Sequence, residues 1–429
     1  MSIALSNDNS FYWHGFDYTF DGEVREKWDV FQEPVPEPGK SFYQKGWIFD
    51  SRGYPRRCKK CGHEEFYSWV AYHREVETLQ RTKAVPVHRF QCRACKATTV
   101  QYFDFVEPGK WYGKDVQRSE LNAFMNHNNS TRSSTNWVDE EHKTCVSNST
   151  VWRWMQEKGE KAEQIMQEEI LPAVHWNAQL KVQSDELYCK GQESQQTQES
   201  HPDSEKKGGK LSIFAGMIYQ YWFIFYAFVS PQATTQEAIR LLRFLQERLV
   251  DVCCLISDGS EIWENALQEV FPNARHLICV FHKMANILNT ETAIQRLFEN
   301  PYISKQKLNK EMDKLLKRLS NQIAELEKQI GQFKDGFITN NHLERHFRFV
   351  RAYVSRIIAF GSVETANKFL SLFVLYWNLR PFQRGKNKGF CPAQLAGFDP
   401  QGKDWLEWLG IPTYDALNRM LRQYHVIST

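Results

Sequence analysis

Five strand-like runs between residues 179 and 281 constrain the fold of this 429-residue chain more than any other feature. They occupy residues 179–190, 211–219, 222–229, 251–258 and 274–281, and are rich in β-branched and aromatic side chains. Between the last three lie two segments with the apolar spacing of amphipathic helices, TTQEAIRLLRFLQERL and EIWENALQEVF. This order predicts an α/β domain with a mixed sheet flanked by helices.

The longest apolar run, from Leu211 to Ser230, is about as long as a membrane-spanning helix. It is rich in β-branched and aromatic residues, and Gln220 interrupts it near its middle. Two adjacent strands explain this composition better than one buried helix does. The start of the chain, MSIALSNDNS, also lacks the basic and apolar parts of a signal peptide. We therefore expect no membrane segment, a cytoplasmic location and reduced cysteines.

The charge of the chain is distributed unevenly. Residues 1–55 contain nine acidic and five basic residues, a net charge of −4, whereas the whole chain carries +3. The remaining residues therefore carry +7. Contacts with nucleic-acid phosphates are a common use for such an excess. Residues 1–55 are rich in aromatic side chains but show no clear period, so they indicate neither a fold nor a role.

Two Cys-x2-Cys pairs, Cys58–Cys61 and Cys92–Cys95, are separated by 30 residues. Each pair turns two sulfurs toward one point, and two pairs complete a tetrahedral thiolate site for Zn²⁺. Four protein ligands leave no open position, so this zinc is expected to be structural. Basic residues surround the pairs in the sequence: Arg56, Arg57, Lys59, Lys60, Arg93 and Lys96. They fit a zinc ribbon lying on DNA phosphates, or a basic rim that faces only water.

Residues 114–161 have a helical pattern that suits a helix-turn-helix. Asp115–Asn126 predicts one helix, and a second follows a polar stretch, with Ser149 as its expected N-cap. A capped helix that opens with small polar side chains can place its first turn in a major groove. We expect the contacts with bases or phosphates from Ser149, Thr150, Arg153 and Gln156. An ordinary helical hairpin gives the same pattern.

Three carboxylates occupy positions that suit a metal site. Asp185 lies in the strand-like run LKVQSDELYCK, and Asp258 ends another run before the turn residues Gly259 and Ser260. A carboxylate at a strand end is rigidly placed and open to solvent, as Mg²⁺ requires. Glu344 lies at the edge of the apolar stripe of the helical segment TNNHLERHFRFVRAYVSRIIAF. Arg348 and Arg351 follow on the same face, where they are expected to hold a DNA strand.

Residues 179–380 resemble the RNase H-like catalytic domain of DDE transposases from bacterial insertion sequences. The matching pieces are SDELYCKG, LISDGSEIWENAL and NNHLERHFRFVRAYVSRIIAFGSVETANKFLSLFVLYWN. The resemblance implies that Asp185, Asp258 and Glu344 form a catalytic triad that binds Mg²⁺ or Mn²⁺. It also implies double-stranded DNA partners, namely transposon terminal inverted repeats and target DNA. A homo-oligomer on DNA is expected, associated with the nucleoid if the host is bacterial.

The 86 residues from Asp258 to Glu344 exceed what a simple domain of this kind needs. The chain is similar here to the mutator-type subgroup, in which an all-helical insertion precedes the last carboxylate. That subgroup also carries a Cys-x2-His after the second carboxylate, and Cys279 and His282 match it. A buried strand cysteine beside a helix-capping histidine would give the same residues.

A long helix is expected over residues 304–335. One apolar stripe runs along it: Leu308, Met312, Leu315, Leu319, Ile323, Leu326, Ile330 and Phe333. These residues are spaced three or four apart, so another helix of this chain or of a second copy must cover them. The same segment has an excess of basic residues. We expect Lys314, Lys317 and Arg318 to face transposon-end DNA.

The sequence thus predicts an α/β fold: an RNase H-like mixed sheet flanked by helices with an all-helical insertion, after a zinc ribbon and a small helical DNA-binding domain. The expected segments are 1–55 (unassigned), 56–105 (zinc ribbon), 112–172 (helix-turn-helix), 179–283 and 339–380 (catalytic domain), 284–338 (insertion) and 381–429 (basic tail). The expected function is DNA strand cleavage and strand transfer at transposon ends. Two alternatives are a non-catalytic DNA-binding regulator and a related nuclease that does not join DNA.

Overall fold

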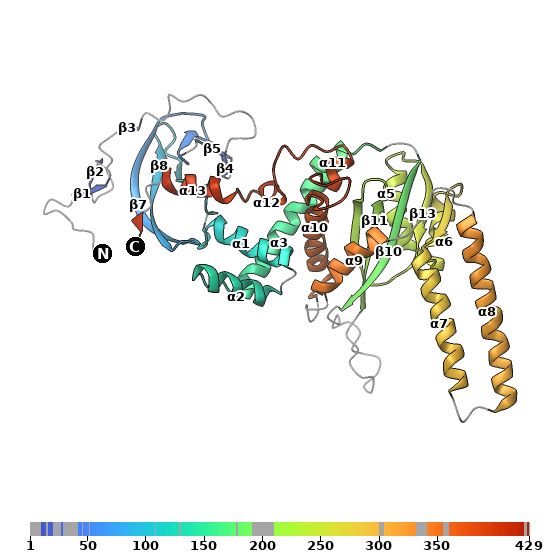
Figure 1. Ribbon diagram of the computed structural model, residues 1–429. Coiled ribbons are helices and arrows are strands. Elements are labelled where there is room, and N and C mark those ends of the chain that lie inside the picture. Colours follow the sequence, from blue (N-terminus) through green and yellow to red (C-terminus); the bar gives the residue numbers. More distant parts are fainter. Residues whose placement is uncertain are drawn as a thin grey trace, which may run out of the picture. The chain divides into compact units, whose positions relative to one another are not determined.

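The structure is a computed structural model. It describes residues 10–13, 16–19, 27–28, 42–44, 46–50, 52–107, 109–127, 130–176, 179–190, 210–299, 304–331, 341–354, 360–423 and 427–428. The chain divides into two compact units, which we treat separately. The N-terminal unit comprises Met1–Val151 and Gly410–Thr429, and the C-terminal unit comprises Trp152–Leu409. Figure 1 gives the element labels.

A long antiparallel hairpin dominates the sheet of the N-terminal unit. It consists of β7 (Phe66–Glu77) and β8 (Thr82–Cys92), with β9 (Thr98–Val100) also paired to β8. The sheet continues through β3 (Lys27–Trp28) on one side and β15 (Ile427–Ser428) on the other. Two smaller sheets are β1–β2 (Ser10–Trp13, Phe16–Thr19) and β4–β5–β6 (Phe42–Gln44, Trp47–Phe49, Pro55–Arg57).

The end of the chain differs from the expected basic tail over residues 381–429. The apolar residues Leu417 and Leu421 of α13 (Tyr414–Gln423) join the buried cluster formed by Val76, Val85 and Phe105. Strand β15 then pairs with β8. Residues 410–423 and 427–428 therefore complete the core and sheet of the N-terminal unit.

Three helices follow the sheet: α1 (Lys114–His127), α2 (Thr131–His142) and α3 (Asn148–Ile165). The sequence predicted only two, because the buried residues of α2 are Ser134, Thr135 and Val138, and so give little apolar period. Ser130 caps α2 by accepting a hydrogen bond from the Ser133 N–H at 3.1 Å.

The start of α3 also corrects the sequence prediction. The Thr150 N–H donates to Ser147 Oγ at 3.2 Å, and the helix begins at Asn148. The N-cap is therefore Ser147 rather than Ser149. The helix continues into the π-helical turn η1 (Met166–Ile170) and α4 (Leu171–Ala173).

The C-terminal unit contains a five-stranded mixed sheet in the order β12-β11-β10-β13-β14. β10 (Leu180–Lys190), β11 (Lys210–Ile218) and β12 (Phe223–Ser230) are antiparallel, whereas β13 (Val252–Ser257) and β14 (Arg275–Ile278) run parallel to β10. All five strands predicted from the sequence are present. The Leu211–Ser230 run forms most of β11 and β12, with Gln220 between them. In the described part of the chain, no helix is long and apolar enough to cross a membrane.

Helices pack against this sheet. α5 (Thr235–Gln246) and α6 (Glu261–Val270) lie on one face, where the Trp263 ring meets Phe214 at 5.8 Å between centroids. α10 (Val363–Leu379) covers the β12 edge: the side chain of Asn367 accepts from the Val229 N–H, and that of Asn378 bonds both backbone groups of Ile224. These asparagines satisfy backbone N–H and C=O groups of an edge strand that would otherwise be open to pairing with another strand.

The predicted long helix is α8 (Lys305–Gly331), and its partner is α7 (Val280–Phe298) of the same chain. The two form an antiparallel hairpin, fixed by the Thr290 Oγ1 to Gln322 Oε1 hydrogen bond of 3.0 Å. The half-buried stripe residues of α8 are Leu308, Met312, Leu315, Leu319 and Leu326. Ile323, expected to be covered, is exposed, and Ile330 and Phe333 lie outside the described side chains.

Candidate functional site

Three carboxylates meet at one end of β10 and β13. Oxygen atoms of Asp185, Glu186 and Asp258 all lie within 4.8 Å of one another, so they can share a metal ion. The pairing of Gln183 with Ile256 explains how two of them meet. Two residues further along these parallel strands, Asp185 and Asp258 occupy equivalent positions on the same side of the sheet.

Glu186 is a member of the cluster that the sequence analysis did not identify. Its side chain leaves β10 toward α6, and one of its oxygens still lies within 4.8 Å of oxygens of Asp185 and Asp258. There its Oε2 accepts a 2.6 Å hydrogen bond from the indole N–H of Trp263. Burial, followed by the nearby negative charge of Asp258, raises the pKa of Glu186. A bound cation would offset both effects.

The turn after β13 fixes Asp258. Its Oδ1 accepts the Ser260 N–H at 2.9 Å, and Ser260 Oγ in turn accepts the Ile262 N–H at the start of α6. Gly259 has φ +90°, and a Cβ there would lie 2.9 Å from Ile278 Cγ2. Only glycine fits this turn without strain. Asp258 is therefore held at a tight strand-to-helix turn.

α9 (Asn341–Val354) lies against β10 and β11. Its buried residues include Leu343, Phe347 and Val350, which confirms the predicted apolar stripe over this range. Glu344 is on this helix, but its side chain is outside the described ones. Arg348 and Arg351 are exposed. The structure thus brings α9 onto β10, the strand that carries Asp185 and Glu186, without placing the third expected carboxylate.

Cys279 and His282 start α7 directly after β14. Cys279 is fully buried, and its N–H donates to the Ser257 carbonyl at 2.7 Å. His282 is half-buried, and its charge when protonated lowers the pKa of Glu186. The motif therefore adjoins the acidic cluster: Cys279 secures the backbone beside Asp258, and His282 lies within electrostatic reach of Glu186.

The four cysteines of the two Cys-x2-Cys pairs converge in the N-terminal unit. Their sulfurs lie within 4.8 Å of one another, and two of the separations are 3.5 Å (Cys58–Cys95) and 3.6 Å (Cys61–Cys92). A tetrahedral zinc–thiolate site has sulfurs ~3.8 Å apart, given Zn–S bonds of ~2.3 Å. The Ala97 N–H lowers the pKa of Cys95 to about 7, which favours a thiolate. This donor set fits Zn²⁺.

The basic residues near these cysteines are not equivalent. Arg57 forms a 2.8 Å ion pair with Glu64, and the guanidinium of Arg93 lies over the Tyr67 ring at 4.5 Å. Lys59 and Lys60 are exposed, whereas Arg56 is half-buried. Lys59 and Lys60 are therefore the better candidates for phosphate contacts, because neither forms an ion pair with any of the described residues.

The amino-terminal half of α3 carries the residues expected to contact DNA. Ser147 Oγ bonds the hydroxyls of Ser149 and Thr150 at 3.0 and 2.8 Å. Ser149 and Arg153 are exposed, and Gln156 is half-buried. The hydroxyl of Ser149 is thus pre-oriented on a solvent-facing helix start, which suits a phosphate or base contact.

Glu120 in α1 predicts a pH-dependent stability. It is fully buried, and its Oε2 accepts a 2.5 Å hydrogen bond from Ser134 Oγ. Burial raises its pKa from 4.5 to about 7. The protonated Glu120 side chain therefore stabilises the folded state fully at pH values below 4.5, its pKa in the unfolded chain, and this contribution to the free energy of unfolding is lost as the pH rises through about 7. Glu120→Gln should therefore be more stable than wild type at pH ~8, by up to ~3 kcal/mol, and converge toward it at pH ~5.

Urea denaturation at both pH values measures this effect. Glu141→Gln, at an exposed position on α2, is the matched control and should follow wild type throughout. A pH-independent difference for Glu120→Gln would contradict the pKa assignment.

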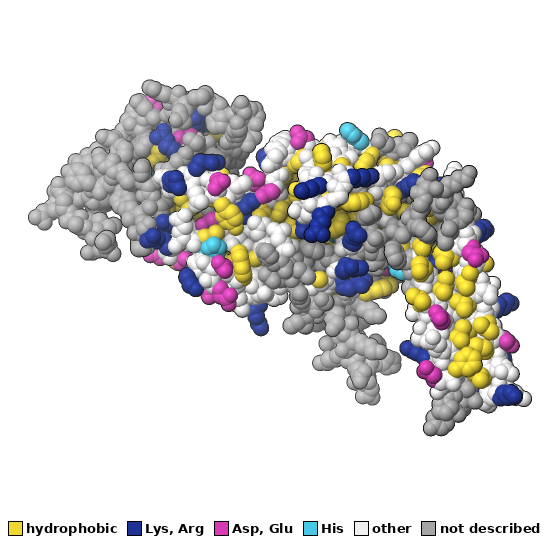
Figure 2. All heavy atoms as spheres, in the orientation of Figure 1, with side chains coloured by type: hydrophobic (Ala, Val, Ile, Leu, Met, Phe, Trp, Pro, Cys, Tyr) yellow, Lys and Arg dark blue, Asp and Glu magenta, His cyan; other side chains and the backbone are white. Residues whose placement is uncertain are grey.

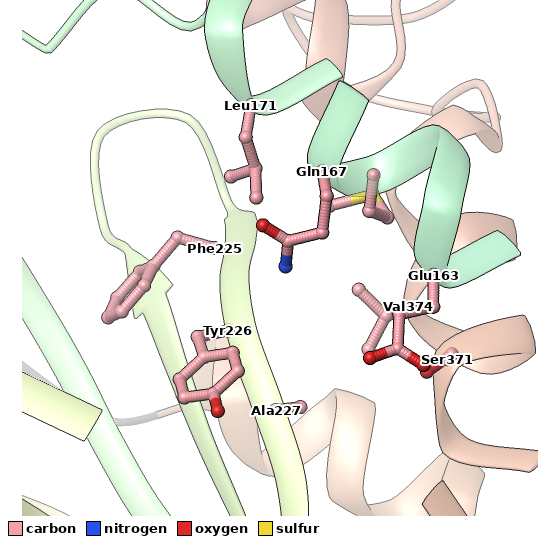
Figure 3. A pocket seen from close by; sticks show the side chains of 9 residues that line it. Glu163, Gln167, Leu171, Phe225, Tyr226, Ala227, Ser371 and Val374 are labelled. Carbon is pink, nitrogen blue, oxygen red and sulfur yellow. The ribbon is translucent and has the colours of Figure 1, made fainter. Parts of the chain in front are cut away.

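A small cavity lies between η1, β12 and α10 (Figure 3). Gln167 extends into it toward β12, and Glu163 and Ser371 lie on the other side. Its volume is about 40 Å³, which is room for one or two water molecules. This cavity is too small to be a substrate site.

Comparisons with known proteins report no family assignment. No protein-family model and no curated protein matches the chain. A simian T-cell lymphotropic virus intasome structure matches with 10% identity over 67% of this chain and 76% of that chain, at a TM-score of 0.22. The crystal structure of the Mos1 strand transfer complex matches with 11% identity over 52% of this chain and 81% of that chain, at a TM-score of 0.16. The Drosophila P element transposase strand transfer complex matches with 11% identity over 74% of this chain and 82% of that chain, at a TM-score of 0.26. TM-scores this low carry no argument about this chain.

Proposed function

We propose that this chain is a DNA transposase that binds transposon ends and catalyses metal-dependent strand cleavage and strand transfer. The observation that carries the proposal is the juxtaposition of Asp185 and Asp258 at neighbouring parallel strands, with α9, the helix that carries Glu344, packed on β10 and β11. The mixed sheet with a helical hairpin between β14 and α9 suits an RNase H-like domain with an insertion, as in mutator-type elements.

The carboxylates fit Mg²⁺ or Mn²⁺, because hard cations prefer oxygen ligands. Asp185, Asp258 and Glu344 would hold the ions. When bound, divalent ions supply the Lewis-acid chemistry that activates a water or 3′-OH nucleophile and stabilises the leaving oxygen. Asp258 contributes a carboxylate fixed by the Ser260 N–H, which limits reorganisation during the reaction. Arg348 and Arg351 are exposed on α9, where they can position a DNA strand.

The N-terminal unit would supply DNA binding. Its four-cysteine cluster suits a structural Zn²⁺, and Lys59 and Lys60 are exposed beside it. The start of α3 offers Ser149 and Thr150 of this unit for groove contacts, and Arg153 and Gln156 follow on the same helix in the C-terminal unit. Separate binding and catalytic units would allow end recognition without involving the carboxylates.

A strand-transfer assay tests the proposal. The purified chain with Mg²⁺ is mixed with labelled DNA from the flanks of its own gene and with a supercoiled target plasmid. Joined products support a transposase. Cleavage without joining indicates a nuclease, and binding without cleavage indicates a regulator; both results reject the proposed activity.

The α8 helix predicts a measurable DNA contact. Lys314, Lys317 and Arg318 are exposed, although Lys314 lies 3.1 Å from Glu311. Changing all three to Glu should weaken end binding and lower the slope of log K against log salt by up to about three units, since each phosphate contact contributes roughly one. The charge-preserving triple variant, with Arg, Arg and Lys at these positions, should keep the wild-type slope. An unchanged slope in the Glu variant would remove this surface from the DNA interface.

A further inference from the structure

The α7–α8 hairpin exposes a row of large apolar side chains (Figure 2). On α7, Met284 is 48% exposed and Phe298 is 69% exposed; on α8, Leu316 is 47% and Ile323 is 41% exposed. Ile287, Ile294, Met312 and Leu319 are half-buried between them. The exposed carboxylate of Glu291 shares this side of α7 with them. Large apolar side chains that gather on one exposed side of a hairpin usually mark an interaction site.

Helical geometry places these residues on one side of the hairpin. Leu316 and Ile323 are two turns apart, and the α7 residues Met284, Ile287, Ile294 and Phe298 fall within ~80° of arc. The hydrogen bond between Thr290 and Gln322 marks where the two helices touch. Viewed from its own amino terminus, each helix carries its apolar row on the clockwise side of that point of contact. Because the helices are antiparallel, equal rotations bring both rows to the same side.

The opposite side of the hairpin has a different chemistry. It carries polar and basic residues, among them Asn289, Arg296, Lys314 and Arg318. An open groove of about 600 Å³ lies there, lined in part by Asn289, Arg296 and Glu311. One hairpin thus presents an apolar side and a basic side, and an interface on the first leaves the second free for DNA.

We propose that the apolar side, defined by Met284, Phe298, Leu316 and Ile323, docks against the same side of a second copy of this chain. Two hairpins would then form a four-helix bundle across a two-fold axis. The 27 residues of α8 span ~40 Å and the 19 residues of α7 span ~28 Å, which at ~10 Å of width per helix gives ~700 Å² per copy. That area is what a stable protein–protein interface needs from each partner.

The charges beside the apolar side favour self-association over a different partner. Lys305 and Glu327 lie on this side near opposite ends of α8, and both are exposed. They are eleven residues before and after Leu316. A two-fold axis near Leu316 therefore brings each Lys305 opposite the Glu327 of the second copy. This pairing is complementary to itself, as an isologous interface requires.

Sedimentation of the full chain without DNA tests the interface. We expect a dimer, and Phe298→Glu with Leu316→Glu should raise its dissociation constant about a hundredfold or more, since both side chains are central and apolar. Both residues are exposed, so helix content by circular dichroism should be unchanged. The matched control, Lys314→Glu with Lys317→Glu on the basic side, should remain dimeric. A monomeric wild type, or an unaffected dimer in the Phe298/Leu316 variant, overturns the proposal.

Cross-linking tests the axis itself. Leu316→Cys should yield a disulfide-linked dimer under mild oxidation, whereas Lys317→Cys, one residue away on α8, should give only the wild-type background. Lys305→Glu should weaken the dimer, and adding Glu327→Lys should restore it. This two-fold arrangement is rejected if Leu316→Cys gives no cross-linked dimer and Glu327→Lys does not restore the dimer weakened by Lys305→Glu. None of these measurements uses strand cleavage, so the interface and the proposed activity can fail independently.

Discussion

Asp258→Asn should lower Mg²⁺-dependent strand cleavage by roughly 10³-fold or more while leaving DNA binding intact. The substitution keeps the shape of the side chain, and the amide oxygen can still accept the Ser260 N–H that fixes the turn. It removes one negative charge from a site where the Asp185 and Glu186 oxygens lie within 4.8 Å. The structure should therefore persist while metal affinity and catalysis are lost. Gel-based cleavage and binding assays on the same DNA measure both effects.

Asp251→Asn, at an exposed position just before β13, is the control and should cleave normally. Asp185→Asn and Glu344→Gln should match Asp258→Asn. Glu186→Gln should have a smaller effect, because the Trp263 indole N–H already occupies one oxygen of that side chain. If Glu186→Gln abolished cleavage and Glu344→Gln did not, the third catalytic carboxylate would be Glu186. Near-normal cleavage by Asp258→Asn would remove the metal site from the proposed function.

The sheet of the C-terminal unit was predictable because its strands leave a local signal. Each is a short apolar run bounded by polar turns, and Gln220 separates β11 from β12 in the sequence as it does in space. The Asp185–Asp258 pair was predictable for a related reason. Asp185 lies in β10 and Asp258 directly follows β13, and the parallel pairing of these strands brings the two residues level.

Glu186 was missed because its role depends on which face of β10 carries α6. In the sequence it is only a second acid after Asp185, and the Trp263 contact comes from 77 residues away. Helix α2 was missed because two of its buried residues, Ser134 and Thr135, are polar, so its buried face has no apolar period in the sequence. Asn367 and Asn378 resemble ordinary polar positions on α10 until the edge of β12 is placed beside them.

Charge counting also has a physical limit. The sequence assigned equal weight to Arg57 and Lys60, but Glu64 neutralises the arginine at 2.8 Å. On α8 the basic excess was visible, whereas its separation from the apolar side required the direction of α7. The ion-pair partners that the fold supplies therefore decide which cations remain available to a ligand.

Loss of zinc should unfold the four-cysteine region while the C-terminal unit stays folded. Cys58 and Cys92 are buried in a small core with Trp47, Phe66 and Phe90, so the metal would cross-link a cluster with few other residues. Structural zinc contributes ~10–16 kcal/mol of binding free energy at neutral pH, as much as the whole stability of a small domain. Cys61→Ser or a strong chelator should therefore expose residues 52–107 to proteolysis.

Elemental analysis should find one zinc per chain, and limited proteolysis should leave an intact fragment from the C-terminal unit. Cys145→Ser, at an exposed thiol of the same N-terminal unit outside the cluster, should retain both zinc and protease resistance. This control separates the loss of a zinc ligand from the loss of any cysteine, because Cys61 belongs to the group of four neighbouring sulfurs and Cys145 does not. Protein purified without chelator and free of zinc would contradict the structural role of this cluster.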